Sequence, residues 1–306
     1  MKATTLLGHN NPIYSVIAHP NLLLFYTAGN DKGIIEWDLN THQHRRIFNQ
    51  IKSTVYALFI IDELNLLIAG CNDGNILFFD LETTQLLETI FVRGAVFDLK
   101  FISHKNEILA STDSGQILII NPEERKIIHQ FQSGNDKIRS IAYHKNLNFV
   151  ATVSNDEFIR IYALDDYTFI IKLKGHENGV GSVAFSPDGK FMITGGRDAH
   201  LKVWNTQNWE CEHNFAAHLF AIYQITIHPK LPFFATASRD KSIKIWRLED
   251  FSLYKKLSID KVKEGHLLSV NDICWSNDGK ELLSVGDDKM VKIWEFDELV
   301  SSLIFA

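Results

Sequence analysis

The sequence lacks the features that mark disulfide-stapled, secreted or membrane-spanning proteins. Its three cysteines, Cys71, Cys211 and Cys274, are far apart and form no Cys-x-x-Cys pair, so neither a disulfide framework nor a zinc site is expected. The first residues, MKATTLLGHNNP, contain no basic segment followed by a long apolar run, and no stretch approaches the roughly 18 apolar residues of a membrane span. We therefore expect a soluble cytoplasmic protein that is not secreted and has no membrane partner.

Clusters of basic residues and the common catalytic motifs are also missing. The net charge is −6 and the isoelectric point is near 6.1, and the lysines and arginines are scattered, so nucleic acid is not expected as a direct partner. The glycine-containing stretches GNDKG and GGRDAH do not join a strand to a helix, as a phosphate-binding loop would. No pair of carboxylates stands out as a general acid and base. These absences predict no cofactor, no metal and no catalytic residue.

A repeat runs through the whole chain. Short segments such as GIIEWDL, NILFFDL and SIKIWRL alternate polar and apolar residues, and each follows a polar turn, as is typical of strands. Their aligned position holds an aromatic residue in six of seven copies, at steps of 42, 41, 42, 42, 42 and 48 residues: Trp37, Phe79, Ile120, Tyr162, Trp204, Trp246 and Trp294. A period in the low forties with about four strands per copy predicts propeller blades, and seven copies are enough to close a ring.

The sequence thus predicts an all-β fold, a seven-bladed β-propeller with four antiparallel strands per blade. No linker or change of composition divides the chain, so we expect one domain spanning residues 1–306. The repeats are expected at about residues 6–47, 48–90, 91–131, 132–173, 174–215, 216–257 and 264–305.

Gly-His pairs strengthen the assignment of the repeat. Gly8-His9, Gly175-His176, Ala217-His218 and Gly265-His266 each place a histidine 28 residues before the aligned tryptophan, and the first copy ends in Trp37-Asp38. With these motifs the chain resembles the WD-repeat (WD40) β-propeller family over essentially its whole length. Copies two, three and four have Ile51, Val92 and Gly134 at the histidine position, and we expect those blades to be softer.

The resemblance implies a structural hydrogen-bond network in each complete blade, joining the histidine to a turn aspartate, a serine or threonine of the second strand and the tryptophan. We assign it to His9, Asp31 and Trp37; His176, Asp198 and Trp204; His218, Ser238, Asp240 and Trp246; and His266, Asp288 and Trp294. Glycine replaces Ser238 in the other three blades, so copy six is predicted to be the only complete one. Ser238, His218 and Asp240 also have the residue types of a hydrolase triad, but a catalytic triad would occur once and its residues would not recur in other copies.

The family's usual partner site is the face that carries the Gly-His loops. Five residues beyond each histidine position stand Tyr14, Tyr56, Phe97, Arg139, Gly181, Tyr223 and Asn271, and two turns carry Arg197 and Arg239. Aromatic and arginine side chains dominate binding hot spots. We therefore predict a non-catalytic scaffold that binds a protein or peptide, acidic or phosphorylated, through Tyr14, Tyr56, Phe97, Arg139, Arg197, Tyr223, Arg239 and Asn271.

Several alternatives stay open at this stage. The aromatics would have no binding role if they only packed against neighbouring loops. A propeller enzyme with a site at the channel mouth is the second functional hypothesis, and only Asp98 and Asp272 loosely suit it. The extra residues 257–264 form either a flap that contacts a partner or a tolerated long loop. Ring closure is expected from the N-terminal segment Ala3–His9, in competition with the tail Leu299–Ala306.

Overall fold

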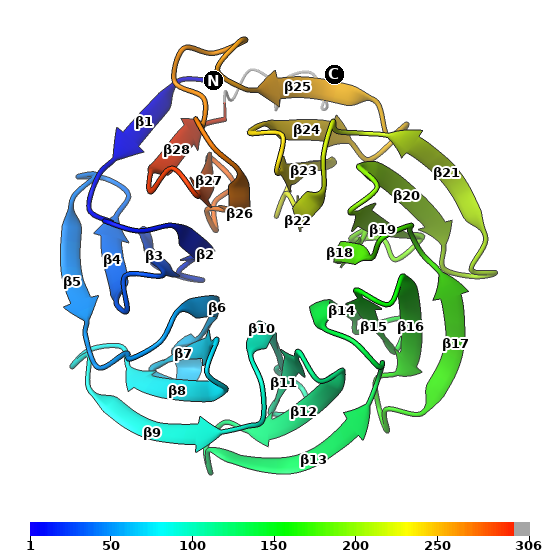
Figure 1. Ribbon diagram of the computed structural model, residues 1–306, viewed down its shortest axis with the longest axis horizontal. Coiled ribbons are helices and arrows are strands. Elements are labelled where there is room, and N and C mark those ends of the chain that lie inside the picture. Colours follow the sequence, from blue (N-terminus) through cyan, green and yellow to red (C-terminus); the bar gives the residue numbers. More distant parts are fainter. Residues whose placement is uncertain (297–306) are drawn as a thin grey trace.

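The computed structural model describes residues 1–296 of the chain, and the tail Leu299–Ala306 lies outside the described residues. Seven four-stranded antiparallel sheets stand around a central channel (Figure 1), which confirms the predicted seven-bladed β-propeller. We number the blades in chain order, so that blade one holds β2–β5 and blade seven holds β26–β28 together with β1. A single short 3₁₀ helix, η1 (Asp62–Leu64), interrupts blade two in the described residues.

The strands occupy the same four positions in every blade. The innermost strands are β2 (Ile13–Ala18), β6 (Val55–Ile61), β10 (Val96–Ile102), β14 (Ile138–His144), β18 (Val180–Phe185), β22 (Ile222–Ile227) and β26 (Val270–Trp275). The second strands are β3 (Leu24–Gly29), β7 (Leu66–Cys71), β11 (Glu107–Thr112), β15 (Phe149–Ser154), β19 (Phe191–Gly196), β23 (Phe233–Ser238) and β27 (Glu281–Gly286).

The third strands are β4 (Ile34–Asp38), β8 (Asn75–Asp80), β12 (Gln116–Asn121), β16 (Phe158–Ala163), β20 (His200–Asn205), β24 (Ile243–Arg247) and β28 (Val291–Glu295). The outer strands are β5 (His44–Phe48), β9 (Leu86–Phe91), β13 (Lys126–Gln132), β17 (Phe169–Lys174), β21 (Cys211–Ala216), β25 (Leu253–Leu257) and β1 (Ala3–Leu6). The inner three strands are largely buried, whereas the outer strands are mostly exposed.

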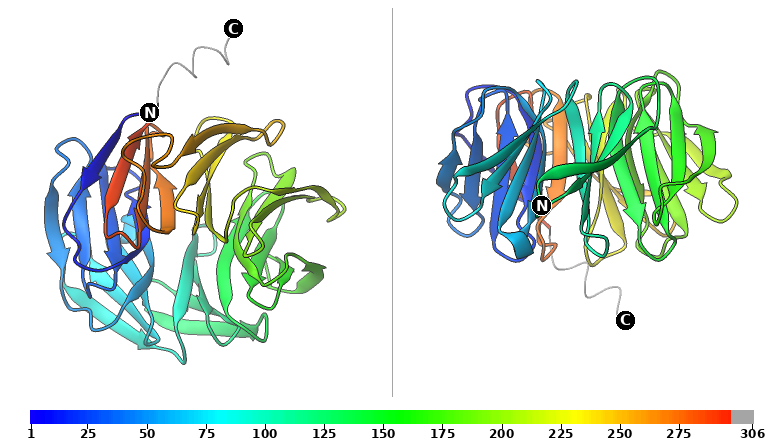
Figure 2. Two further views of the ribbon diagram at one scale, coloured as in Figure 1. Left: turned by 45° about the horizontal axis from the view of Figure 1, so that its top comes forward. Right: turned by 90° about the horizontal axis from the view of Figure 1, so that it is seen from below.

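The N-terminal strand closes the ring, as the sequence predicts. β1 pairs with β28 over four residues, from Ala3 opposite Trp294 to Leu6 opposite Val291, and the blue N-terminal strand lies beside the red one in Figure 1. Ala3 and Leu6 are buried. The oblique view likewise shows the blue N-terminal strand beside the red last strand of the ring (Figure 2). Closure therefore depends on a segment nearly 300 residues away from its partner in the sequence.

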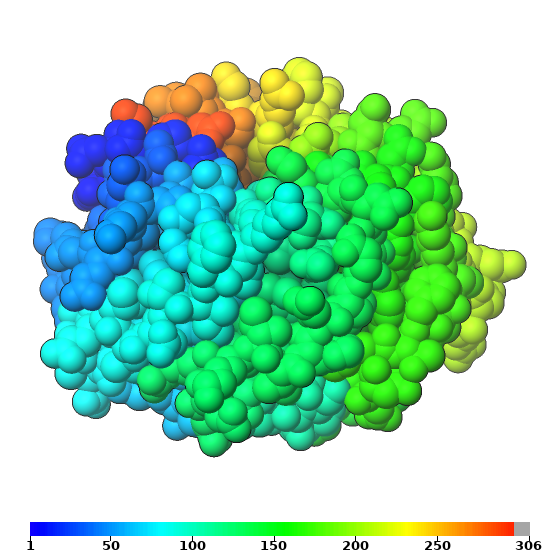
Figure 3. All heavy atoms as spheres, turned by 60° about the horizontal axis from the view of Figure 1, so that its bottom comes forward, coloured from blue at the N-terminus to red at the C-terminus, as the bar shows by residue number. Residues whose placement is uncertain are grey.

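The hydrophobic core is divided among the junctions between blades. The described residues form seven apolar clusters, and each cluster combines the facing sides of two neighbouring blades. The cluster between blades seven and one, for example, packs Val291 and Ile293 against Phe25 and Trp37. In the space-filling view the blades follow one another in chain order along the visible wall (Figure 3). Because each sheet buries both faces against neighbours, every blade needs the whole ring.

The insertion between β25 and His266 folds back on the molecule. Its two ends meet, because Gly265 lies against the backbone of Ser258 and Ile259. The insertion also contacts the N-terminal strand, because Glu264 Oε2 accepts a hydrogen bond of 3.2 Å from the amide of Ala3. Val262 packs against the cluster between blades six and seven. The insertion therefore supports ring closure, a role that neither expectation from the sequence included.

Candidate functional site: the mouth of the central channel

One residue of each innermost strand is extruded from the ladder at the channel mouth. The pairing of every innermost strand with the second strand skips one position, for example between Ile13 and Ser15 and between Val55 and Ala57. Such a β-bulge turns its residue out of the sheet. The seven skipped positions are Tyr14, Tyr56, Phe97, Arg139, Gly181, Tyr223 and Asn271, and all seven line a cavity of about 800 Å³. Repeated backbone geometry thus gathers seven unlike side chains around one opening.

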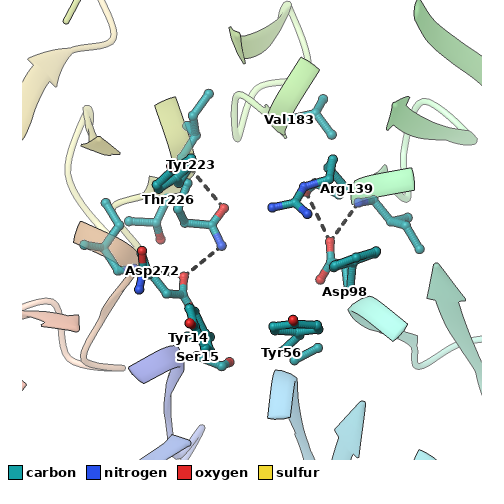
Figure 4. Close-up of a pocket in the computed structure, with 18 of the residues that line it drawn as sticks. Tyr14, Ser15, Tyr56, Asp98, Arg139, Val183, Tyr223, Thr226 and Asp272 are labelled. Carbon is teal, nitrogen blue, oxygen red and sulfur yellow. Dashed lines mark hydrogen bonds between the residues drawn. The ribbon is translucent and has the colours of Figure 1, made fainter. Parts of the chain in front are cut away.

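Three of these side chains form a continuous aromatic arc across blades one to three. The ring centroids of Tyr14 and Tyr56 are 5.4 Å apart in an edge-to-face arrangement, and those of Tyr56 and Phe97 are 5.3 Å apart and stacked. The guanidinium of Arg139 continues the row at 4.6 Å from the Phe97 ring centroid. Figure 4 shows Tyr14, Tyr56, Arg139 and Tyr223 around the same opening. All three aromatics remain partly exposed, so the arc offers a surface as well as internal packing.

Positive charge gathers next to the aromatic arc. Lys137, Arg139 and Arg197 line the cavity, and their side chains form no ion pair or hydrogen bond with residues 1–296. Burial, and then the nearby charge of Arg197, lowers the pKa of the half-buried Arg139 guanidinium. Like charges held together without counter-ions favour an anionic ligand.

The opposite side of the mouth is polar and acidic. Asn271 donates hydrogen bonds from Nδ2 to the Ile13 carbonyl at 2.9 Å and to Asp287 Oδ1 at 2.8 Å, so its amide fixes the junction between blades seven and one. Burial, and then the charge of Asp287, raises the pKa of Tyr14. The mouth therefore carries its cations on blades four and five, and the carboxylates Asp113 on blade three and Asp287 on blade seven.

Arg239 lies apart from the other predicted contact residues. It does not line the cavity, and its exposed guanidinium lies 5.9 Å from the Phe220 ring centroid. Arg139 and Arg197 are thus brought together with the aromatics, whereas Arg239 belongs to the surface around Phe220. The sequence alignment predicted Arg139, Arg197 and Arg239 on one face, but it could not show which of them line the cavity.

Below the mouth, polar side chains link neighbouring blades. Asp98 Oδ2 accepts a hydrogen bond from the amide of Ile141, at 2.7 Å, and Asp272 Oδ2 accepts one from the amide of Val16, at 2.9 Å. Gln224 joins this set by donating to Asp272 Oδ1 at 2.9 Å (Figure 4). Asp98 also pairs with Lys100 at 2.8 Å. The two aspartates that suited a channel enzyme are therefore held in separate sets of contacts between blades.

Four blades contain the expected histidine network, but its hydroxyl comes from a different residue. In blade six, Asp240 accepts from His218 Nδ1 at 2.9 Å, which leaves His218 Nε2 to accept from Thr236 Oγ1 at 2.8 Å. Trp246 Nε1 donates to the same hydroxyl at 2.9 Å. Ser238 instead donates to the Phe220 carbonyl and accepts from the Asp240 amide. The assignment of Ser238 to the tryptophan network was therefore wrong, because Ser238 is the last residue of β23 and its hydroxyl bonds the turn instead.

The corresponding hydroxyls in the other three blades are Thr27, Thr194 and Ser284. Each bonds the histidine and accepts from the indole of its own blade, namely Trp37, Trp204 and Trp294. Glycine at the Ser238 position therefore does not interrupt the network. Burial is the main cause that lowers the pKa of all four histidines, which fits neutral rings that donate to a carboxylate through Nδ1.

Blades two and three have apolar residues at the histidine, hydroxyl and tryptophan positions of the network. Ile51, Ala69 and Phe79 stand at the histidine, hydroxyl and tryptophan positions of blade two, and all three are buried. Blade three has Val92, Ala110 and Ile120 there. Joint replacement avoids leaving one member of the histidine, hydroxyl and indole set without its partners, which a single replacement would do.

Blade four has a different polar network. Tyr162 donates to Ser133 Oγ at 3.0 Å, and Ser133 Oγ lies 2.7 Å from Thr152 Oγ1. Arg160 takes the place of the histidine at the turn carboxylate, with Nη2 2.6 Å from Asp156 Oδ2. Gly134 at the histidine position therefore does not remove the network from this blade.

Histidines at another repeated position cap turns on the far face. Nδ1 of His19 accepts from the amides of Asn21 and Leu22, and Nδ1 of His228 accepts from those of Lys230 and Leu231. His144 bonds the amide of Leu147 in the same way. No group of three or more potential metal ligands occurs within the described residues.

Exposed apolar side chains next to two of the histidines were missed from the sequence. Leu219 and Phe220 follow His218, and Leu267 and Leu268 follow His266; they are 80%, 56%, 48% and 47% exposed. The two residues after the histidine position in the first five copies include no such apolar pair: Asn10-Asn11, Lys52-Ser53, Arg93-Gly94, Asn135-Asp136 and Glu177-Asn178. Comparison of the copies at this position would have found them.

Comparison with known proteins agrees with the repeat. The family model described as "WD domain, G-beta repeat" matches residues 2–38, 125–163, 167–205, 209–247 and 258–295, well over half of the chain. The unmatched stretch includes all of blade two and most of blade three, where apolar residues replace the histidine network. No helix in the described part of the chain is long and apolar enough to cross a membrane.

Similar curated proteins share about a quarter of the aligned residues. A striatin homolog of Dictyostelium discoideum is 24% identical over 55% of this chain and 22% of its own length. The WD repeat-containing protein SL1-17 of Schistosoma mansoni is 24% identical over 54% of each chain. The GATOR2 complex protein Wdr24 of Drosophila melanogaster is 26% identical over 46% of this chain and 19% of its own length. The alignments thus span from a fifth to about half of these relatives.

Proposed function

Because the chain belongs to the WD-repeat family of β-propeller proteins, we propose that it is a non-catalytic scaffold that binds a protein or peptide at its channel mouth. Proteins of this family typically act as interaction scaffolds, and one relative is named as a member of a protein complex. The observation that carries the proposal is the aromatic arc of Tyr14, Tyr56 and Phe97 beside three cations that have no counter-ion in the described part of the chain.

The chemistry of the mouth favours an extended segment with an apolar anchor and an acidic or phosphorylated residue. The stacked rings offer a flat apolar surface at low conformational cost. Lys137, Arg139 and Arg197 then meet the anionic group, and two of them are guanidinium groups that bind carboxylates or phosphates through paired hydrogen bonds. The three cysteines are unpaired, which supports a cytoplasmic location in this proposal.

The test is affinity capture from the native host with identification of the bound proteins. The double variant Tyr56→Ala/Phe97→Ala is expected to retain its fold, with a stability loss of about 1 kcal/mol from the stacked pair. It is expected to capture at least about tenfold less of the specific partner than the wild type does. Arg139→Gln/Arg197→Gln is expected to lose the same partner in a salt-dependent way. Phe169→Ala/Ile170→Ala on β17 is the matched control, because these side chains are 53% and 42% exposed outside the mouth. Equal capture by all four proteins contradicts the proposal.

A further inference from the structure

The loops that follow the histidines of blades six and seven expose four apolar side chains on the face that surrounds the mouth. We define the blade 6–7 loop patch as Leu219, Phe220, Leu267 and Leu268. None of the four lines the central cavity. The patch is therefore a surface separate from the proposed site at the mouth.

Hydrogen bonds hold both loops in place, so the apolar side chains do not tuck inward. The amide of Leu219 donates to Asp240 Oδ2 at 3.0 Å, and the amide of Leu267 donates to Asp288 Oδ2 at 2.9 Å. Ser238 Oγ donates to the carbonyl of Phe220 at 3.1 Å. These acceptors and donors belong to the histidine turns described above. The patch is thus preorganised, which lowers the entropy cost of binding.

Three basic residues belong to the turns that bond the two patch loops. Arg239 lies beside Phe220, and Lys241 and Lys289 follow the turn aspartates of blades six and seven. All three are exposed, and within residues 1–296 their side chains form no ion pair or hydrogen bond.

The aspartates next to these cations in the sequence are already engaged. Asp240 and Asp288 are only 4% and 3% exposed, and each pairs with the histidine of its own blade. The chain as a whole is acidic, with a net charge of −6, yet Arg239, Lys241 and Lys289 have no counter-ion among residues 1–296.

We propose that the blade 6–7 loop patch docks a second, amphipathic acidic segment of a protein partner, in which leucine- or phenylalanine-type side chains alternate with aspartate or glutamate. The apolar side chains of that segment cover Leu219, Phe220, Leu267 and Leu268. Its carboxylates meet Arg239, Lys241 and Lys289. Charge complementarity selects the partner and accelerates encounter, while the apolar contacts hold it.

A peptide segment suits this surface better than an anionic membrane does. A bilayer would have to approach the whole flat face of the ring, and blades three to five carry the carboxylates Asp113, Asp136 and Glu177 on that face. These groups repel anionic lipid headgroups. A short segment covers blades six and seven without meeting them.

The test is selection of a random twelve-residue peptide library displayed on phage against the whole protein. Enriched peptides are expected to carry at least two large apolar residues and a net negative charge. Binding of one such synthetic peptide, measured by fluorescence anisotropy, is expected to weaken at least about tenfold in Leu219→Ser/Phe220→Ser and in Arg239→Glu. Peptide binding is also expected to weaken when the salt concentration is raised from about 0.05 to about 0.5 M. This range runs from weak to strong screening, because the Debye length falls from about 14 to about 4 Å.

Controls separate this inference from the proposed function. Phe169→Ser/Ile170→Ser removes another exposed apolar pair, on β17, and is expected to leave binding unchanged. Tyr56→Ala/Phe97→Ala should also leave this peptide bound, because the patch lies outside the cavity. If that variant alone abolishes binding, the peptide occupies the mouth and the patch proposal is wrong while the proposed function stands. The absence of acidic enrichment overturns the patch proposal as well.

Two other occupants are tested with the same variants. Flotation with phosphatidylserine vesicles, lost in Leu219→Ser/Phe220→Ser, would assign the patch to a membrane. A dimer of the wild-type protein in light scattering that becomes a monomer in the same variant would assign it to a second copy of this chain. Either result overturns the acidic-segment proposal.

Discussion

Replacing Thr236 by valine removes one buried hydroxyl from blade six and keeps nearly the same shape. Thr236 is fully buried, and its Oγ1 both donates to His218 Nε2 and accepts from Trp246 Nε1. Valine leaves these two nitrogens without a partner inside the blade. Each such orphan costs about 1–3 kcal/mol, so the free energy of unfolding should fall by about 3 kcal/mol. Ser238→Ala breaks bonds only in the turn and should cost about 1 kcal/mol.

Urea unfolding of the two variants and the wild type measures this difference. Thr236→Ser is the matched control, because Ser284 holds the same position in blade seven and bonds His266 and Trp294 there. This variant keeps the hydroxyl and loses one methyl group, at a cost of about 1 kcal/mol. The reasoning is refuted if Thr236→Val is no less stable than Ser238→Ala, or if Thr236→Ser is as unstable as Thr236→Val. Binding of the selected peptide should survive in Thr236→Ser.

Three further predictions concern closure, titration and the substitute network. Deletion of residues 1–7 removes β1 and its four pairs with β28, so the melting temperature should fall by about 10 °C; a change below about 2 °C contradicts closure by β1. Burial raises the pKa of Asp272 to about 6 from 3.8, so the folded state binds this proton more tightly. As the pH falls from about 7 to about 4.5, the free energy of unfolding of the wild type, measured in urea, should therefore rise by about 2 kcal/mol relative to that of Asp272→Asn. The same pH dependence in both proteins rejects this prediction. Tyr162→Phe should cost about 1 kcal/mol by the loss of its bond to Ser133, whereas Tyr143→Phe, on the channel side of β14, should not.

The blades could be predicted because each copy repeats the same local signals. The strand pattern and the aspartate turn recur at nearly constant spacing, and the Gly-His pair recurs in four blades with one Ala-His variant. Such regularity fixes which residues share a structural position even before the ring is known. The same alignment placed Tyr14, Tyr56, Phe97 and Arg139 at one position, and the structure gathers them at the mouth.

Predictions failed where a residue's place along its strand, or the residue next to it, decided its role. Ser238 and Thr236 are two residues apart on β23, yet only Thr236 meets the histidine and tryptophan, because Ser238 ends the strand and bonds the turn. Gly134 suggested that blade four lacks the network, but Ser133 and Tyr162 supply another one. Leu219 and Phe220 lie in a loop, where no strand pattern marks a residue as exposed or buried.

The sequence by itself determined the number of blades, their strand pattern and the positions that vary among them, since these depend on local periodicity and spacing. Only the tertiary structure decided which varied residues share a surface. Closing the ring brings β1 to β28 and sets seven bulges around one opening, while Arg239 lies beside Phe220 and outside that opening. Contacts between blades are long-range, and a repeat of 42 residues carries no local signal of which neighbours its side chains will meet.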